Sequence, residues 1–214
     1  MTQIDIKFAL NELEITGFYI VKNYFDINLC KEIIDTIDQK INKFSKGDGM
    51  DFRHYHFENE SEHSRNFLMD HNTQQVCDEY MKLPLIEKRC QAGLVIHDKN
   101  SKNSSGGGWH VDKRSKQFKA ILYLSSVTED NGYFSIIPKT NFRLSDFNTC
   151  PKFDGDNSMT RFEVLELIKK DIFNNRIKIL GNPGDLILVD TSNIHRGEEI
   201  LNGKRYSLTN YYYN

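Results

Sequence analysis

Long apolar runs, a basic leader and paired cysteines are missing from this sequence, and each absence argues against a class of protein. No run of about 18 apolar residues occurs, so the sequence predicts no membrane-spanning helix and no membrane partner. The first residues mix acids with apolar side chains and lack the basic and apolar regions of a secretory signal peptide. We therefore expect a cytoplasmic protein.

The four cysteines show no spacing that would indicate a disulfide framework or a zinc site. Cys30, Cys77, Cys90 and Cys150 are scattered along the chain without C-x-x-C spacing. This usage is typical of a reduced intracellular protein, not of a secreted chain held by disulfides. We expect them to be small, buried hydrophobic residues.

The charges nearly cancel, which argues against polyanionic partners. The chain has 28 Lys and Arg against 30 Asp and Glu, a formal net charge of −2 at pH 7. Such a balance provides no global attraction to nucleic acid or anionic lipid. Tyr206 and Tyr211–Tyr213 have no basic groove around them, so we expect a strand there, not a platform for stacking bases. A small-molecule substrate is the expected partner, and the sequence does not indicate an oligomeric state.

The first half of the chain predicts helices. After Asp26, a residue type that caps helices, apolar residues from Leu29 to Phe44 recur at a spacing of about 3.6 residues. We expect this helix to pack on a sheet, with a short strand at 17–21 before it and a second helix over about 62–82. No internal repeat occurs, and 214 residues can bury a large core, so we expect one domain over residues 1–214.

The second half changes to short β-prone segments separated by turn formers such as Asp130-Asn131-Gly132 and Asn182-Pro183-Gly184. A helix is expected over about 161–173, among strands at 118–127, 133–138, 175–180, 185–190 and 205–213. This order predicts an α+β fold: a jelly roll, or double-stranded β-helix of the cupin type, braced by N-terminal helices. The mouth of such a barrel is a place for a ligand.

The segment Trp109-His110-Val111-Asp112 contains the strongest candidate for a metal site. Residues two apart on a strand point to the same side, so His110 and Asp112 can hold one ion. A third ligand must come from elsewhere, and His195 follows a β-prone segment that ends at Asp190. Two imidazoles and one carboxylate leave three positions open, an arrangement that suits Fe(II) enzymes that activate O2. An isolated H-x-D is weak evidence, and His195 strengthens it.

Arg205 is the candidate anchor for a co-substrate. If the co-substrate is 2-oxoglutarate, its 2-oxo acid chelates iron and its distal carboxylate needs a fixed cation, for which the planar guanidinium is best suited. Arg205 falls on the strand after His195, and Ser207 faces the same way and can donate its hydroxyl. Arg196 and Lys204 compete for this role, although Arg196 adjoins the ligand and should point away from the metal or toward the rim of the site.

Several other residues remain open. The polar, glycine-containing segment 98–108 is long enough to be a lid or an ordinary loop. Trp109 should face away from His110 and pack in the core. The phase of the strands does not decide whether Gln91, Lys119 and Tyr123 face a cavity. The local cluster His54, His56, His63 and His71 lacks the partners of a second metal site, so surface or pocket histidines are expected.

These residues together resemble the phytanoyl-CoA dioxygenase-like family of 2-oxoglutarate/Fe(II)-dependent oxygenases, over nearly the whole chain. The N-terminal segment 13–41, LEITGFYIVKNYFDINLCKEIIDTIDQKI, is similar to that family's first strand and helix. WHVD resembles its H-x-D step, and Asp130-Asn131-Gly132 its E-N-G turn. GDLILVDTSNIHRGEEILNGKRYSLTNYY, at 184–212, resembles its distal histidine and arginine segment. One departure is Pro138-Lys139-Thr140-Asn141, where many relatives have P-G-S-H.

The resemblance implies an oxygenase that hydroxylates an unactivated C–H bond of a small molecule and releases succinate and CO2. A sugar, an amino-acid derivative or an acyl thioester are the substrates considered. Relatives that halogenate have a small residue at the position of Asp112, so its presence favours a hydroxylase or desaturase. Two alternatives stay open: a cupin-type metalloprotein without 2-oxoglutarate, which gives Arg205 no role, and a non-catalytic binding protein on the same fold.

Overall fold

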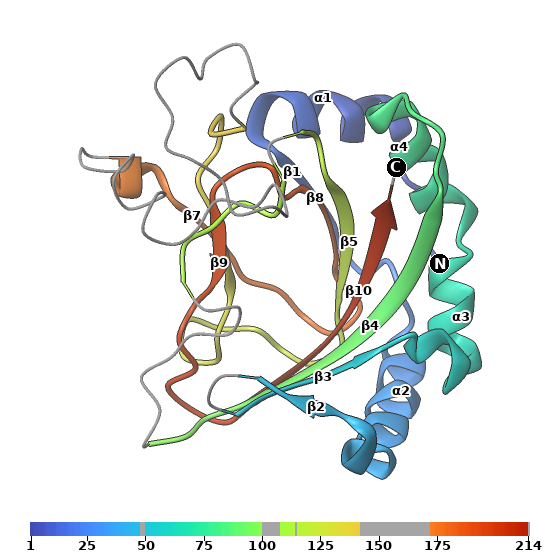
Figure 1. Ribbon diagram of the computed structural model, residues 1–214, viewed down its shortest axis with the longest axis vertical. Helices are drawn as coiled ribbons and strands as arrows, with labels where there is room; N and C mark the ends of the chain where they lie inside the picture. The colour runs from blue at the N-terminus through green and yellow to red at the C-terminus, as the bar shows by residue number, and fades with distance from the viewer. Residues whose placement is uncertain (48–49, 100–107, 114, 142–171, 214) are drawn as a thin grey trace.

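The computed structural model describes residues 1–47, 50–99, 108–113, 115–141 and 172–213. Two antiparallel sheets face each other, a large one of seven strands in the order β1-β8-β5-β10-β4-β3-β2 and a small one in the order β7-β6-β9 (Figure 1). The strands are β1 (Phe18–Val21), β2 (Ser45–Lys46), β3 (Asp51–Tyr55), β4 (Glu87–Ile96), β5 (Phe118–Tyr123), β6 (Phe134–Ile136), β7 (Ile177–Ile179), β8 (Leu186–Asp190), β9 (His195–Gly197) and β10 (Lys204–Tyr213). The expected double-stranded β-helix core, braced by N-terminal helices, is confirmed.

The helices lie against the outer face of the large sheet (Figure 1). They are α1 (Ile6–Thr16), α2 (Ile27–Gln39), α3 (Glu62–Leu68) and α4 (His71–Met81). The short 3-10 turns η1 (Ile41–Lys43) and η2 (Phe57–Asn59) follow α2 and β3 in the chain, and a third, η4 (Ile172–Asn175), precedes β7 of the small sheet. Among the described helices, none combines the length and apolar character needed to cross a bilayer.

The predicted Asp26 cap is confirmed, because its carboxylate accepts hydrogen bonds from the backbone N–H groups of Asn28 and Leu29. The predicted helix over 62–82 is wrong in one respect: it is two helices, α3 and α4. Asp70 separates them, since its side chain accepts the N–H of Thr73 and caps α4. A side chain that competes for backbone donors starts a new helix instead of continuing the old one.

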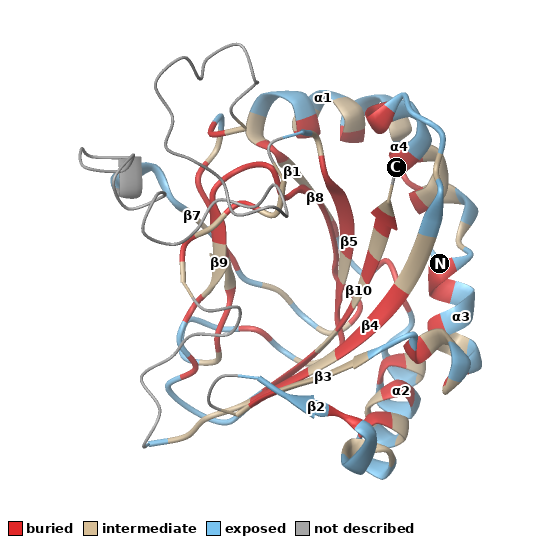
Figure 2. Cartoon of the chain, viewed as in Figure 1, coloured by how far each residue is buried: buried red, intermediate tan, exposed pale blue. Residues whose placement is uncertain are grey.

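Alternation along the strands gives the large sheet two different faces. Cys90, Ala92 and Leu94 of β4 pack in the core beneath the helices, together with Tyr206, Leu208 and Tyr212 of β10. The intervening residues line a cavity between the two sheets; they are Gln91, Gly93, Val95, Arg205, Ser207, Thr209 and Tyr211. One strand therefore contributes both to the core and to a polar interior. Figure 2 shows the buried and intermediate positions along β10.

A second, smaller core joins the two sheets. Its buried members are Tyr123, Val127, Tyr133, Ile136, Ile179, Ile187 and Val189. Cys30, Cys77 and Cys90 are buried free thiols, as expected, and Cys150 lies outside the described residues. The expected helix over 161–173 and most of the candidate lid at 98–108 also lie outside the described residues.

The predicted strands of the second half are present with shorter bounds, except that β10 begins one residue earlier. Strands β3 and β4 were not predicted. On the face that lines the cavity, β3 has the charged residues Asp51 and Arg53, and β4 has Gln91 and Gly93. Their sequences therefore do not show the clean apolar alternation of a half-buried strand. Their absence from the sequence-based prediction matters, because β3 and β4 form one wall of the cavity.

Candidate metal centre and its cavity

Backbone pairing brings the two halves of the H-x-D…H pattern together. His110 and His195 form an antiparallel bridge, with N–H to carbonyl distances of 3.0 and 2.9 Å in the two directions. The N–H of Asp112 donates to the carbonyl of Thr191 at 3.0 Å. Segments that are distant in the sequence are therefore fixed to each other by main-chain hydrogen bonds beside the candidate metal site.

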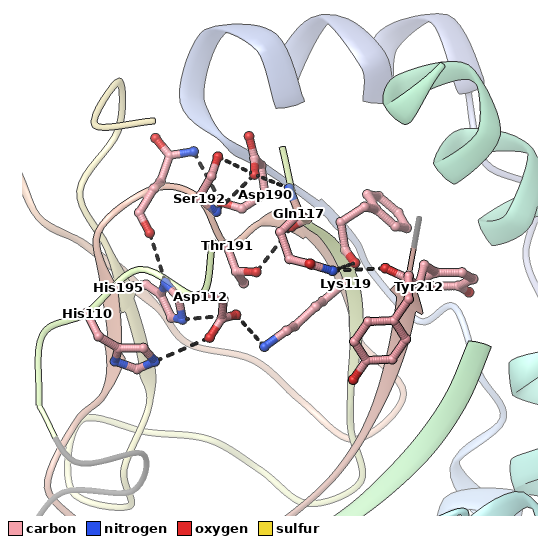
Figure 3. A network of polar contacts seen from close by, with 12 residues as sticks. His110, Asp112, Gln117, Lys119, Asp190, Thr191, Ser192, His195 and Tyr212 are labelled. Atoms are coloured by element: carbon pink, nitrogen blue, oxygen red, sulfur yellow. Dashed lines mark hydrogen bonds and ion pairs between the residues drawn. The ribbon is translucent and has the colours of Figure 1, made fainter. Parts of the chain in front are cut away.

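A buried turn holds the segment that leads to His195. The Asp190 carboxylate accepts hydrogen bonds from the N–H of Gln117 at 3.1 Å and from both the N–H and the hydroxyl of Ser192 at 3.0 and 2.6 Å (Figure 3). It also accepts one from the hydroxyl of Tyr80 at 2.8 Å. These bonds tie β5, β8 and α4 to the turn. Sequence reasoning placed a strand end here but did not identify Asp190 as the residue that organises the turn.

The three side chains converge. One potential ligand atom from each of His110, Asp112 and His195 lies within 4.8 Å of the other two (Figure 3). His110 Nε2 is 3.6 Å from Asp112 Oδ1, and His195 Nε2 is 3.8 Å from Asp112 Oδ2. Ligand atoms about 2.1 Å from one ion lie about 3 Å apart in octahedral geometry, so modest side-chain rotation closes these distances onto a cation.

Hydrogen bonds select the histidine tautomer that a metal needs. His110 Nδ1 bonds to the carbonyl oxygen of Gly108, and His195 Nδ1 to that of Asn193, each at 2.8 Å. A carbonyl only accepts, so both Nδ1 atoms carry the proton of the neutral ring. Each Nε2 lone pair then points to the shared site. Burial, with the nearby His110, lowers the pKa of His195 to about 3, so His195 is neutral at pH 7.

Asp112 provides the negative charge. Burial by itself would raise the pKa of its carboxyl, but Lys119 and the two imidazoles outweigh that effect and hold the pKa well below its usual range. Lys119 forms an ion pair with Asp112 Oδ2, which accepts no hydrogen bond of good geometry from the described residues. An ionised carboxylate with an incompletely satisfied oxygen, facing two Nε2 lone pairs, fits a divalent cation.

The residues beside the histidines face away, as the strand phase predicts. Trp109 is buried, and the Arg196 guanidinium lies 4.8 Å from its ring. Arg196 also pairs with Glu198, which accepts a hydrogen bond from Ser135 at 2.7 Å. Arg196 is therefore engaged outside the cavity and does not compete for an anion within it.

Arg205 lies in the same cavity as the triad. The cavity has a volume of about 190 Å³ and is lined by His110, Asp112, His195, Arg205 and Ser207, among others. Burial lowers the pKa of Arg205, although Tyr123 and Asp51 oppose that effect, and a guanidinium remains charged at neutral pH. Lys204, the competing residue, donates to the hydroxyl of Tyr206 at 2.6 Å and is exposed. Arg205 is thus a buried cation that faces a space large enough for a small dicarboxylate.

Gln91, Lys119 and Tyr123, whose orientation the sequence left open, all line the cavity. Sequence reasoning missed Asp51 and Arg53 of β3, because that strand was not predicted. Arg53 Nη2 is 2.6 Å from Asp51 Oδ2. Tyr211 was predicted only as a strand residue, and its alternation with the buried Tyr212 was the available signal that it faces inward.

The four N-terminal histidines do not assemble. His63 pairs with Glu32 at 2.8 Å and His54 lies 3.7 Å from Glu60, while His56 pairs with Glu58 at 3.2 Å. In the part of the chain that the structure describes, His110, Asp112 and His195 are the only group of three side chains with metal-ligating geometry.

No protein-family model and no curated protein sequence matches this chain. Solved structures do. The epimerase SnoN in complex with Fe3+, alpha ketoglutarate and nogalamycin RO aligns with a TM-score of 0.76 and 12% identity, over 98% of this chain and 83% of that one. HygX from Streptomyces hygroscopicus with nickel and 2-oxoglutarate bound aligns with a TM-score of 0.68 and 13% identity, over 96% and 86%.

A Pseudomonas putida prolyl-4-hydroxylase aligns with a TM-score of 0.65 and 12% identity, over 97% of both chains. At this level of identity the likeness shows the fold, which is the double-stranded β-helix of these proteins. It does not distinguish the phytanoyl-CoA dioxygenase-like family from other families with the same fold.

Proposed function

We propose that this chain is a 2-oxoglutarate- and O2-dependent non-haem Fe(II) dioxygenase. His110, Asp112 and His195 would hold the iron, and Arg205 with Ser207 would hold the distal carboxylate of 2-oxoglutarate. The observation that carries the proposal is the presence of the triad and the buried Arg205 in one cavity. The solved structures with the same fold support it, because two of them contain a metal together with alpha ketoglutarate or 2-oxoglutarate.

The protein contributes binding and orientation. The Nδ1 hydrogen bonds of His110 and His195 keep both Nε2 atoms available, and Lys119 holds one Asp112 oxygen. Three protein ligands would leave three coordination positions for the co-substrate and O2. The chemistry that Fe(II) supplies when bound is O2 activation, in which one oxygen atom enters succinate as CO2 leaves and the other enters the substrate.

Arg205 and Ser207 account for the choice of co-substrate. A guanidinium matches the geometry of a carboxylate, and a charge-assisted hydrogen bond between them contributes about 1.5–3 kcal/mol in a sheltered site. Gly93 leaves room beside them, since a Cβ at this position would lie 3.3 Å from Ser207 Oγ. A cupin-type metalloprotein without 2-oxoglutarate would have no use for this arrangement, and a non-catalytic protein would need neither Arg205 nor the triad.

The family, the domain organisation, the location and the type of reaction are also proposals. We infer membership of the phytanoyl-CoA dioxygenase-like family from the WHVD, Asp130-Asn131-Gly132 and C-terminal segments. We also propose that residues 1–214 form one domain and that the protein is cytoplasmic. Hydroxylation of a C–H bond is the proposed outcome. The neighbours include an epimerase and a prolyl-4-hydroxylase, so proteins of this fold are described with different reactions.

Anaerobic titration with Fe(II) and 2-oxoglutarate tests the proposal, because chelation produces a visible charge-transfer band. Arg205→Met should weaken 2-oxoglutarate binding at least about tenfold, since it removes the buried charge partner. Lys204→Met is the matched control, because Lys204 is the adjacent cation and faces away. Retained Co(II) binding shows that the variants are folded. The absence of a band in the wild type, or equal affinity in Arg205→Met, contradicts the proposal.

A further inference from the structure

A row of three side chains crosses the cavity face of the large sheet and ends at the candidate metal centre. Arg89 of β4 pairs in register with Tyr211 of β10, which pairs with Lys119 of β5. The Lys119 ammonium lies 4.3 Å from the Tyr211 ring centre and forms the ion pair with Asp112. Arg89 therefore lies on the same transverse row as the metal site, at the other end.

Aromatic rings hold Arg89 in place. Its guanidinium carbon is 4.8 Å from the ring centre of Tyr213, 5.2 Å from that of Tyr55 and 5.9 Å from that of Tyr211. It donates a hydrogen bond to the Tyr213 hydroxyl at 2.5 Å. Rigid aromatic contacts of this kind preorganise a guanidinium for binding an anion.

The charge of Arg89 is not balanced locally. Among the described residues, no carboxylate lies within ion-pair distance of Arg89, and its Nε has no hydrogen-bond acceptor. The two acids among the residues that line the cavity already form ion pairs: Asp112 with Lys119, and Asp51 with Arg53. Arg89 is half-buried, so part of its side chain remains accessible. This end of the row can accept an anionic group.

The side-chain amide of Gln91 gives a second, independent indication of a ligand that donates a hydrogen bond. Gln91 lies two residues after Arg89 on the same face of β4 and lines the cavity. Its side chain is 7% exposed, and its Oε1 accepts no hydrogen bond from the described residues. A buried amide oxygen without a donor is costly, so a ligand N–H or O–H at this point would be favoured.

The spacing sets the size of the ligand. Arg89 and Lys119 lie on strands separated by β10, and two strand spacings amount to about 10 Å. A molecule whose charged group contacts Arg89 must therefore extend by several bonds to place a C–H group near the triad. An amino acid whose side chain extends over several bonds has this length, with its head group at one end and its side chain directed to the metal.

We propose that the substrate is a free amino acid with an extended side chain: its carboxylate binds Arg89, its N–H donates to Gln91 and its side chain extends along Tyr211 to the metal centre. This assignment rests on the proposed function, which places the oxidising centre at the triad. Arg89 and Gln91 would then select the substrate, and Arg205 would select the co-substrate. Two carboxylates would thus have separate anchors on the same face of the large sheet, on opposite sides of Gly93 along β4.

The test uses the Fe(II)–2-oxoglutarate protein under anaerobic conditions, with free L-amino acids as probes. Binding is measured by the shift of the visible band and by saturation-transfer NMR. We expect at least one amino acid to bind, its carboxamide to bind at least about tenfold more weakly, and glucose not to bind. Arg89→Gln should weaken that amino acid about tenfold or more, and Arg89→Lys should weaken it less.

Gln91→Leu should remove the preference for the amino acid over its desamino analogue, which has no N–H group to donate to Gln91. Lys88→Met is the matched control, because Lys88 faces the opposite side of β4 and donates to Gln74. If the band forms and no amino acid binds, if the carboxamide binds equally well, or if Arg89→Gln changes nothing, the substrate assignment is wrong and the proposed function stands. If the band itself does not form, both are wrong.

Discussion

The ammonium group of Lys119 forms an ion pair with the Asp112 carboxylate inside the cavity. Burial alone would lower the pKa of Lys119, but Asp112 and Tyr211 outweigh it, and the pKa lies above its ordinary value. The pair keeps Asp112 ionised in the protein without a metal and holds one of its oxygens in a fixed direction. Lys119 is therefore a positioning residue for the candidate metal ligand.

Replacing Lys119 tests this role. Lys119→Met should destabilise the metal-free protein by about 1–3 kcal/mol, because it leaves a largely buried carboxylate without its cation. Mn(II) should restore more stability to the variant than it adds to the wild type, since the ion replaces the missing charge. Urea unfolding with and without Mn(II) measures both effects. Lys116→Met removes a more exposed pair with Glu14 and should cost less than about 1 kcal/mol; equal costs would contradict the assignment.

Loss of His195 should abolish tight metal binding. His195→Ala removes a ligand whose lone pair is fixed by the Asn193 carbonyl, so Co(II) affinity should fall by more than about 100-fold. His63→Ala is the matched control, because its imidazole pairs with Glu32 outside the cavity. Calorimetric titration with Co(II) distinguishes the variants. Unchanged affinity in His195→Ala would place the metal elsewhere.

Among the described glycines, Gly184 should be the one at which alanine is tolerated least. It has φ +90°, and a Cβ at this position would lie 2.3 Å from the Phe25 carbonyl oxygen. Gly184→Ala should therefore cost more than about 3 kcal/mol, whereas Gly203→Ala should cost about 1 kcal/mol. Gly203 also has positive φ, at +69°, but its Cβ would meet nothing within 4 Å. Urea unfolding of both variants separates the steric clash from the backbone strain, and similar costs would contradict the predicted clash.

Asp185 should make stability depend on pH. Burial would raise its pKa, but hydrogen bonds from Lys22 and from the N–H groups of Asn182 and Asn23 outweigh it, so the folded-state pKa lies below its ordinary value. This contribution is present above the unfolded pKa of about 3.9 and is lost as the pH falls through the folded pKa.

Asp185→Asn removes that titration. The variant should be about 1–3 kcal/mol less stable than the wild type at pH 7, and the difference should narrow as the pH falls below about 4. Urea unfolding at a series of pH values measures it. A difference that stays constant down to pH 3 would mean that the charge of Asp185 does not contribute.

Local patterns were sufficient for much of this protein. The Asp26 cap, the helix after it and the strands of the second half follow from side-chain periodicity and turn chemistry, which act over a few residues. The phase of a strand likewise predicted that His110 and Asp112 share one side and that Trp109 faces the other. These predictions succeeded because each depends on neighbours in the chain.

The tertiary structure decided what those patterns could not. Periodicity shows that a strand has two faces, but not which face turns inward or which strand lies beside it, because pairing register is set by contacts between distant segments. The tertiary structure alone therefore showed that Lys119 lies beside Asp112 and that Arg89, Tyr211 and Lys119 form a row. It also showed the unpredicted strand β3 in the wall of the cavity. The sequence by itself determined which side chains were available for chemistry, and strand register determined which of them share a cavity.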